Sequence, residues 1–157
     1  MNKKTIEELP EPSLIEIEKD EKHLKKINER WDDLREYAEK DLTDPPENDF
    51  HLPTINNKWL GFRSDFVKVL LELDLKREKI ERQLLVEYRT QYNVKLNKEE
   101  EDLFIRTDAR YTRLYEKCKR TEGVLHYIEG IHKAIENKYY LVKEYNIRQR
   151  YMKGSLD

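Results

Sequence analysis

The sequence predicts an all-α protein: a long antiparallel helical hairpin, coiled-coil-like, preceded by an extra N-terminal amphipathic helix. Of its 157 residues, 41% are charged and only 37% are hydrophobic, which is typical of long helices with narrow apolar stripes. Four glycines and five prolines leave few turn residues, so we expect a few long elements. Because narrow stripes bury little apolar area, we expect stability to come from a homo-oligomer.

The first predicted elements are a flexible tail at residues 1–12 and an acidic N-terminal helix at residues 13–42. Ser13 followed by Glu16 is a capping box that starts this helix. Its apolar residues recur at helical spacing, and its other face is strongly acidic. A proline-containing linker at residues 43–54 follows it.

The hairpin is predicted at residues 55–153, with its first arm beginning near Thr54 or Ile55 and its tip near 93–97. The second arm begins at Asn97, an N-cap with a partner in Glu100. Both arms carry apolar seams at alternating steps of three and four. The first seam comprises Ile55, Trp59, Phe62, Phe66, Val69, Leu73, Ile80, Leu84 and Tyr88. The second comprises Phe104, Thr107, Tyr111, Leu114, Cys118, Thr121, Leu125, Ile128, His132, Ile135, Tyr139 and Val142, with Gly123 and Gly130 as the expected bend points.

Charge is distributed unevenly along the chain. Residues 1–57 hold 9 Lys and Arg against 16 Asp and Glu, a balance of −7, whereas residues 58–157 hold 22 against 17, a balance of +5. Beside the second seam, cations recur at steps of four and three: Arg106, Arg110, Arg113, Lys117 and Arg120. One interpretation is a row that forms ion pairs with a neighbouring helix, and the other is a surface that follows phosphates.

Further cations lie near the predicted tip, on the first arm. Lys79, Arg82 and Arg89 share a face, with tyrosines close by. Cations that follow phosphates and aromatic rings that stack on bases are typical of single-strand binding. The candidate DNA-binding residues are therefore Lys79, Arg82, Arg89, Tyr92, Arg106, Arg110, Arg113 and Lys117.

The segment 138–153 extends past what the shorter first arm covers. It contains five cations, one anion and four tyrosines. An apolar stripe without a partner in the same chain is a surface for association. We therefore expect subunit contacts in this segment and just before it, at Ile135, Tyr139, Val142 and Tyr145.

Motifs of catalysis, metal binding and membrane insertion are missing from the sequence. It has no glycine-rich phosphate loop, no paired cysteines and no His-Glu-x-x-His motif, and its four histidines are scattered. We therefore expect no enzyme, no metal and no cofactor. The lone Cys118, on the seam, fits a reducing cytosol, and the lack of a leader or long apolar run predicts a cytoplasmic protein without a membrane partner.

Two segments resemble the bacteriophage UvsY family of recombination mediators. One is Leu52-Pro53-Thr54-Ile55-Asn56-Asn57-Lys58-Trp59-Leu60, which is similar to the opening of the conserved part of that family. The other runs from Leu125 to Gly154, including Gly130, Ala134-Ile135 and the ending Asn146-Ile147-Arg148-Gln149-Arg150-Tyr151-Met152-Lys153-Gly154. The resemblance covers roughly residues 50–154.

The resemblance implies a ring-like homo-oligomer, a hexamer or heptamer, that binds single-stranded DNA. It also implies a phage single-stranded-DNA-binding protein and a phage recombinase as partners, and a location in the host cell cytoplasm. The family motif Lys-Ala-Arg-Leu falls near Glu81-Arg82-Gln83-Leu84, where only Arg82 and Leu84 keep its character, so Arg82 and Arg89 are the contacts carried over. The alternative is a helical adaptor or structural coiled-coil protein that does not bind nucleic acid.

Overall fold

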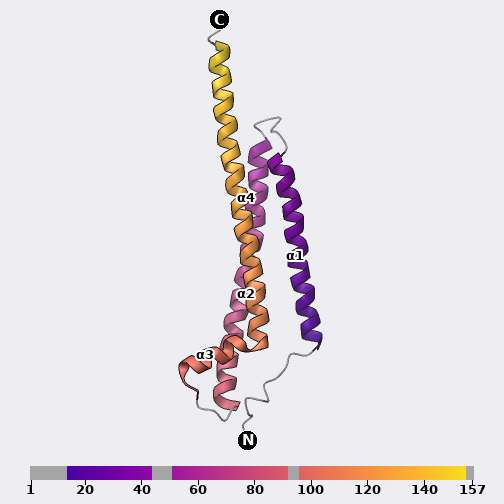
Figure 1. Ribbon diagram of the computed structural model, residues 1–157, viewed down its shortest axis with the longest axis vertical. Coiled ribbons are helices and arrows are strands. Elements are labelled where there is room, and N and C mark those ends of the chain that lie inside the picture. The colour runs from indigo at the N-terminus through magenta and orange to yellow at the C-terminus, as the bar shows by residue number, and fades with distance from the viewer. Residues whose placement is uncertain (1–13, 44–50, 92–95, 155–157) are drawn as a thin grey trace. The chain divides into compact units, whose positions relative to one another are not determined.

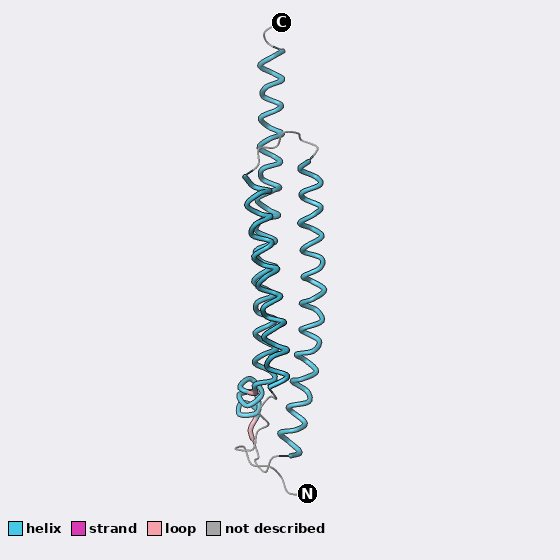
Figure 2. The backbone as a smooth tube through the Cα atoms, turned by 90° about the vertical axis from the view of Figure 1, so that its right-hand side faces the viewer, coloured by secondary structure: helices cyan, strands magenta, loops and turns pink. Residues whose placement is uncertain are grey.

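The computed structural model describes residues 14–43, 51–91 and 96–154, which form four helices and no strand (Figures 1 and 2). These are α1 (Leu14–Thr43), α2 (His51–Gln91), α3 (Lys98–Thr107) and α4 (Ala109–Gly154). The prediction of an all-α fold is confirmed. The chain divides into two compact units, unit 1 (Met1–Asn28 and Lys68–Glu122) and unit 2 (Glu29–Val67 and Gly123–Asp157).

Unit 2 is built from parts of α1, α2 and α4. The end of α1 meets the start of α2, where Trp59 Nε1 donates to Asp41 Oδ2 at 2.9 Å and Lys58 pairs with the same carboxylate. Lys138 of α4 donates to the last carbonyl groups of α1, those of Asp41 and Leu42, and so satisfies acceptors that a helix end leaves open. The buried hydrophobic residues are Leu34, Ala38, Trp59, Phe66, Val124, Leu125, Ile128 and Ile135.

Unit 1 pairs α2 with α3 and the first part of α4 in antiparallel order. Leu84, Tyr88 and Ile105 form one buried cluster, against which Phe104 and Tyr111 pack. Cys118 and Thr121 are fully buried, and burial is the main cause of the raised pKa of the Cys118 thiol. Most of the predicted seam residues are buried or half-buried, but the seam prediction is wrong for Val69, Thr107 and Tyr139, which are exposed.

The second arm of the hairpin is interrupted at Asp108, and not at either glycine. Asp108 has φ −63° and ψ 129°, an extended conformation that ends α3. Its N–H still bonds to the carbonyl oxygens of Phe104 and Ile105, and α4 starts at the next residue. Gly123 lies within α4 instead, where an added Cβ would stand 3.2 Å from the ring of Trp31, so this glycine makes room for packing.

Two helix starts can be compared with their predictions. The N-cap at Asn97 is confirmed: its side chain accepts from the Glu100 N–H, and the Glu100 carboxylate accepts from the Asn97 N–H. The predicted start of α2, near Thr54 or Ile55, is three or four residues too late, because α2 begins at His51 and Pro53 lies in its first turn. A proline is tolerated there, since the N–H groups of the first turn have no partner within the helix. The capping box at Ser13 and the tip residues 92–95 lie outside the described residues.

Among the helices described, none is long and apolar enough to cross a bilayer.

Candidate functional site

The outer face of α2 in unit 1 carries a shallow groove of about 750 Å³. This face exists because the core-facing residues of α2, such as Leu73 and Leu84, leave the opposite side of the helix uncovered. The groove is lined by Leu75, Glu78, Lys79, Arg82, Gln83, Val86 and Glu87.

Two of the predicted DNA-binding cations, Lys79 and Arg82, lie in this groove. The side chain of Arg82 is 83% exposed, and its Nη2 atom lies 3.8 Å from Glu78 Oε2, at the outer limit of an ion pair. Leu75 and Val86 beside them are also well exposed. The groove therefore combines solvent-facing cations with apolar surface, which suits a ligand with phosphates and flat bases.

Arg89 lies further along α2 and is held by α3. Its Nε and Nη2 atoms donate to the two carboxylate oxygens of Glu101 at 2.8 and 2.9 Å. This hydrogen bonding raises the pKa of Arg89 and lowers the pKa of Glu101. A bidentate pair of this kind fixes both the position and the plane of the guanidinium group.

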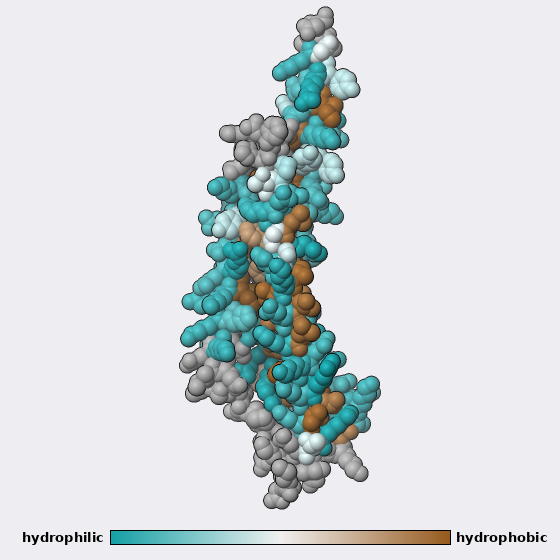
Figure 3. Space-filling model, turned by 180° about the vertical axis from the view of Figure 1, so that it is seen from behind, coloured by the Kyte–Doolittle hydropathy of each residue, from teal (hydrophilic) through white to brown (hydrophobic). Residues whose placement is uncertain are grey.

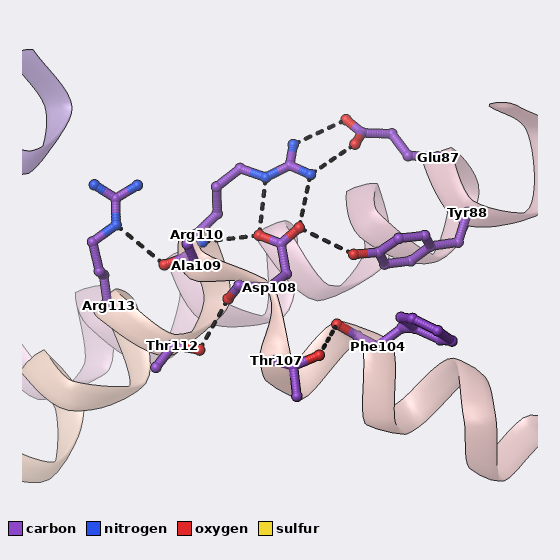
Figure 4. A network of polar contacts seen from close by, with 9 residues as sticks. All are labelled: Glu87, Tyr88, Phe104, Thr107, Asp108, Ala109, Arg110, Thr112 and Arg113. Atoms are coloured by element: carbon purple, nitrogen blue, oxygen red, sulfur yellow. Dashed lines mark hydrogen bonds and ion pairs between the residues drawn. The ribbon is translucent and has the colours of Figure 1, made fainter. Parts of the chain in front are cut away.

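Arg110 lies at the centre of a polar network at the bend (Figure 4). It donates to both oxygens of Asp108, at 3.1 and 3.0 Å, and to both oxygens of Glu87 on α2, at 3.2 and 2.9 Å. Tyr88 donates its hydroxyl proton to Asp108 at 3.1 Å. The network thus ties the start of α4 to α2.

The ionisation of Asp108 reflects two opposing effects. Burial by itself raises the pKa of this carboxyl. The hydrogen bonds and charge of Arg110, together with the hydrogen bond from Tyr88, lower the pKa by more than burial raises it, so the net pKa is lowered. The bonds to Asp108 and Glu87 raise the pKa of Arg110. Both groups are therefore charged at neutral pH, and the pair holds the bend.

The other cations of the predicted row are in different environments. Arg106 is exposed on α3, before the bend. Arg113 donates from Nε to the carbonyl oxygen of Ala109 at 3.1 Å, and Lys117 is only 7% exposed. Arg120 binds Glu116 of its own helix and Asn28 of α1. The regular spacing of the five cations does not produce one uniform basic surface, because the bend at Asp108 and the packing around α4 place them differently.

The residues predicted for subunit contacts divide in the same way. Ile135 is 1% exposed in the single chain, so it belongs to the core of unit 2. Val142 is half-buried, whereas Tyr139 and Tyr145 are exposed. Figure 3 shows hydrophobic side chains on the surface of the C-terminal part of α4, at the upper end of the view. Tyr92 lies outside the described residues.

Comparison with known proteins identifies the family of the chain. The family model described as "Recombination, repair and ssDNA binding protein UvsY" matches residues 33–155. The chain belongs to the UvsY family. Comparison with curated proteins gives no match.

A solved member of the UvsY family has a similar fold. The crystal structure of the bacteriophage T4 recombination mediator protein UvsY superposes with a TM-score of 0.68, at 16% sequence identity. The alignment covers 78% of this chain and 98% of that chain. The resemblance seen in the two quoted segments is thus confirmed at the level of family and fold.

Three acidic residues of the candidate site have no role in the sequence prediction: Glu87, Glu101 and Asp108. A partial signal exists for Asp108, since Asp is a preferred N-cap, and its Oδ1 does accept from the Arg110 N–H at 2.8 Å. Glu87 and Glu101 give no such signal, because each pairs with an arginine on another helix. Within the described part of the chain, no group of three or more His, Cys, Asp and Glu side chains is arranged to hold a metal.

Proposed function

We propose that this UvsY-family chain binds single-stranded DNA and acts as a non-enzymatic recombination mediator. Membership of a family described as recombination, repair and single-stranded-DNA-binding proteins carries the proposal. The open groove on α2 with its solvent-facing cations supports it, because it is the kind of surface that the function requires.

In this proposal, Lys79 and Arg82 contact the phosphates of the strand. Both side chains lie in the groove and reach solvent from α2, so a phosphate oxygen can approach them without displacing the core. Leu75 and Val86, more than half exposed, provide apolar surface for the faces of bases. Arg106, also exposed, adds positive charge from α3. Binding of this kind weakens steeply with salt, because each neutralised phosphate releases counterions.

We also propose that identical subunits assemble into a ring, a hexamer or heptamer, through the C-terminal part of α4. Exposed apolar and aromatic residues lie there on two separate faces, about 120° apart by helical periodicity. One face holds Leu141, Tyr145 and Met152, and the other holds Tyr140, Ile147 and Tyr151. A helix with two different contact faces suits head-to-tail association, which closes into rings. Tyr139 and Val142 fall on the remaining side of the helix, and we include them in the proposed contact.

A ring of this kind supplies the mediator activity through multivalency. Each subunit presents one α2 groove, and the linked grooves raise the effective concentration for every further contact with the same strand. We propose that the ring holds the strand in a form that favours a phage recombinase over the competing single-stranded-DNA-binding protein. The site of action is the host cell cytoplasm.

A second candidate function is a helical adaptor without nucleic-acid binding. The pair between Arg110 and Glu87 favours it, because here a cation of the predicted row serves an interhelical contact. Glu78 and Glu87 also line the α2 groove and offset part of its positive charge. The two functions differ in whether DNA binds at moderate salt.

The test is binding of a fluorescent single-stranded oligonucleotide across a salt series, with light-scattering mass measured on the same sample. We expect a large oligomer that binds tightly at low salt. Lys79→Gln with Arg82→Gln should weaken binding and reduce the slope of log affinity against log salt by about 1.4, since single strands contribute about 0.7 per phosphate.

The matched control is Lys22→Gln with Lys26→Gln, which removes the same charge from exposed positions of α1. This variant should retain most of the affinity. Equal losses in both double variants would show a general charge effect and contradict the groove as the site. If the unmodified protein does not bind DNA, the mediator function is contradicted and the helical adaptor is the remaining candidate function.

A further inference from the structure

The short helix α3 places an acidic turn beside Arg89 of α2. Its first turn contains Glu99, Glu100 and Glu101. Ile105 holds the helix against the buried cluster with Leu84 and Tyr88. The position of this acidic turn is therefore fixed by core packing.

The contact between α3 and Arg89 has the geometry of a phosphate site that is already filled. Two guanidinium nitrogens of Arg89 face two carboxylate oxygens of Glu101, which is the arrangement that arginine also forms with phosphate. The side chain of Arg89 is 60% exposed, whereas that of Glu101 is only 13% exposed. The guanidinium group is thus open to a ligand from solvent on the side that Glu101 leaves uncovered.

We propose that Arg89 is a phosphate-binding residue of the DNA surface and that Glu101 occupies it as an internal substitute for phosphate. The inference rests on the proposed function, because the competing ligand is the phosphodiester backbone of single-stranded DNA. Arg89 lies seven residues after Arg82 on α2, hence on the same face of the helix. Single-stranded DNA that leaves the groove along this face therefore reaches Arg89 next, and one of its phosphates displaces the carboxylate of Glu101.

Displacement requires little of the fold. Rotation of the Glu101 side chain is enough to release Arg89, while Ile105 keeps α3 in place. Only the Arg89 side of the pair is well exposed, and water and salt weaken the pair from that side, so a backbone phosphate in a multivalent complex can compete. In the free protein, the internal carboxylate lowers the affinity of Arg89 for other anions, and it thereby restrains non-specific binding of polyanions.

Glu101→Gln tests this inference, with Glu99→Gln as the matched control. Both substitutions remove one negative charge from the same turn of α3, but only Glu101 contacts Arg89. Affinity for a fluorescent single-stranded oligonucleotide is measured for the full chain across a salt series. Circular dichroism and light scattering verify that helix content and oligomer mass are unchanged.

For Glu101→Gln we expect binding that is tighter by about two- to fivefold, the range that the strength of an exposed pair allows. The salt slope should steepen by up to about 0.7, because in the unmodified protein the displaced Glu101 carboxylate takes up a counterion, and this offsets part of the release at the Arg89 phosphate contact. Glu99→Gln should show a smaller gain. Adding Arg89→Gln to Glu101→Gln should remove the gain.

Unchanged or weaker binding by Glu101→Gln, while the unmodified protein binds, would overturn the inference and leave the proposed function in place. An equal gain in Glu99→Gln would also overturn it, because net charge would then be the cause. Absence of binding by the unmodified protein and by Glu101→Gln at low salt would contradict the proposed function and this inference together.

Discussion

Two regions of unit 1, the outer face of α2 and the bend at Asp108, show how an arginine's neighbours determine its use. Arg82 on the outer face is 83% exposed, and its ion-pair contact, to Glu78, is long at 3.8 Å. Arg110 at the bend is 27% exposed and bonds to two carboxylates. The first is available to a ligand, whereas the second stabilises the junction of three helices, although both are arginines on the hairpin arms.

The difference follows from the desolvation of the carboxylates. The side chain of Asp108 is 4% exposed, so its charge requires a partner inside the protein. Glu78 is more than half exposed, and water can solvate it in place of Arg82. The predictions below test this comparison from the largest expected effect to the smallest.

Arg110→Gln should cause the largest loss of stability. The amide cannot replace the bonds to Asp108 and Glu87, and Asp108 is left as a buried charge. We expect the free energy of unfolding, measured by urea titration, to fall by about 2–3 kcal/mol. A loss no greater than that of Arg82→Gln would break the comparison, because it would show that the buried pair contributes nothing.

Asp108→Asn should cost about 1–2 kcal/mol at neutral pH, since the charge-assisted bonds to Arg110 weaken while an Asn cap remains possible. The sign of the pH dependence follows from the lowered pKa of Asp108. Its ionised form stabilises the fold above the ordinary Asp pKa, about 3.9, and this stabilisation disappears as pH falls through the lower pKa of the folded state.

The difference in stability between the unmodified protein and Asp108→Asn should therefore shrink below about pH 4. Urea titrations at a series of pH values measure this difference. A difference that stays constant down to the lowest pH would show that the carboxylate of Asp108 is not the stabilising species.

Tyr88→Phe removes only the hydroxyl that donates to Asp108. The ring stays in its cluster with Leu84 and Ile105, so the expected loss is about 1 kcal/mol. Thermal unfolding at neutral pH provides the measurement. In the Asp108→Asn background the effect should be smaller, and a full effect there would mean that the hydroxyl acts on another group.

Arg82→Gln should change the free energy of unfolding by less than about 0.5 kcal/mol, as is usual for exposed positions. The same urea titration measures it beside Arg110→Gln. A loss of more than about 1 kcal/mol would show that Arg82 has a structural partner and would remove the contrast between the two regions.

Much of the fold follows from the sequence because apolar periodicity is a local property. The seams at steps of three and four, the cap at Asn97 and the long helices all depend on residues close together in the chain. The bend at Asp108 interrupts a continuous periodic pattern and is stabilised by Tyr88 and Glu87 on another helix. A helical pattern in the sequence shows which residues are neighbours along one helix. It does not show which residues of different helices contact each other.

The same limit explains the candidate site. The spacing predicts that Arg82 and Arg89 lie on one face of α2, and Arg82 does line the groove on the outer face. Two pairings depend on the antiparallel register of the arms: that of Arg89 with Glu101 and that of Arg110 with Glu87. The sequence therefore predicts which cations share a face, and only the structure distinguishes exposed cations from paired ones.

The most direct test of this account compares Arg82→Gln with Arg110→Gln for single-stranded DNA binding. The measurement is made at a temperature where circular dichroism shows both variants to be folded. We expect Arg82→Gln to weaken binding and to reduce the salt slope by about 0.7. Arg110→Gln should weaken binding less, through the unpaired charge of Glu87 in the groove, and should keep the slope of the unmodified protein. The reverse result, with binding lost at Arg110 and kept at Arg82, would contradict the account.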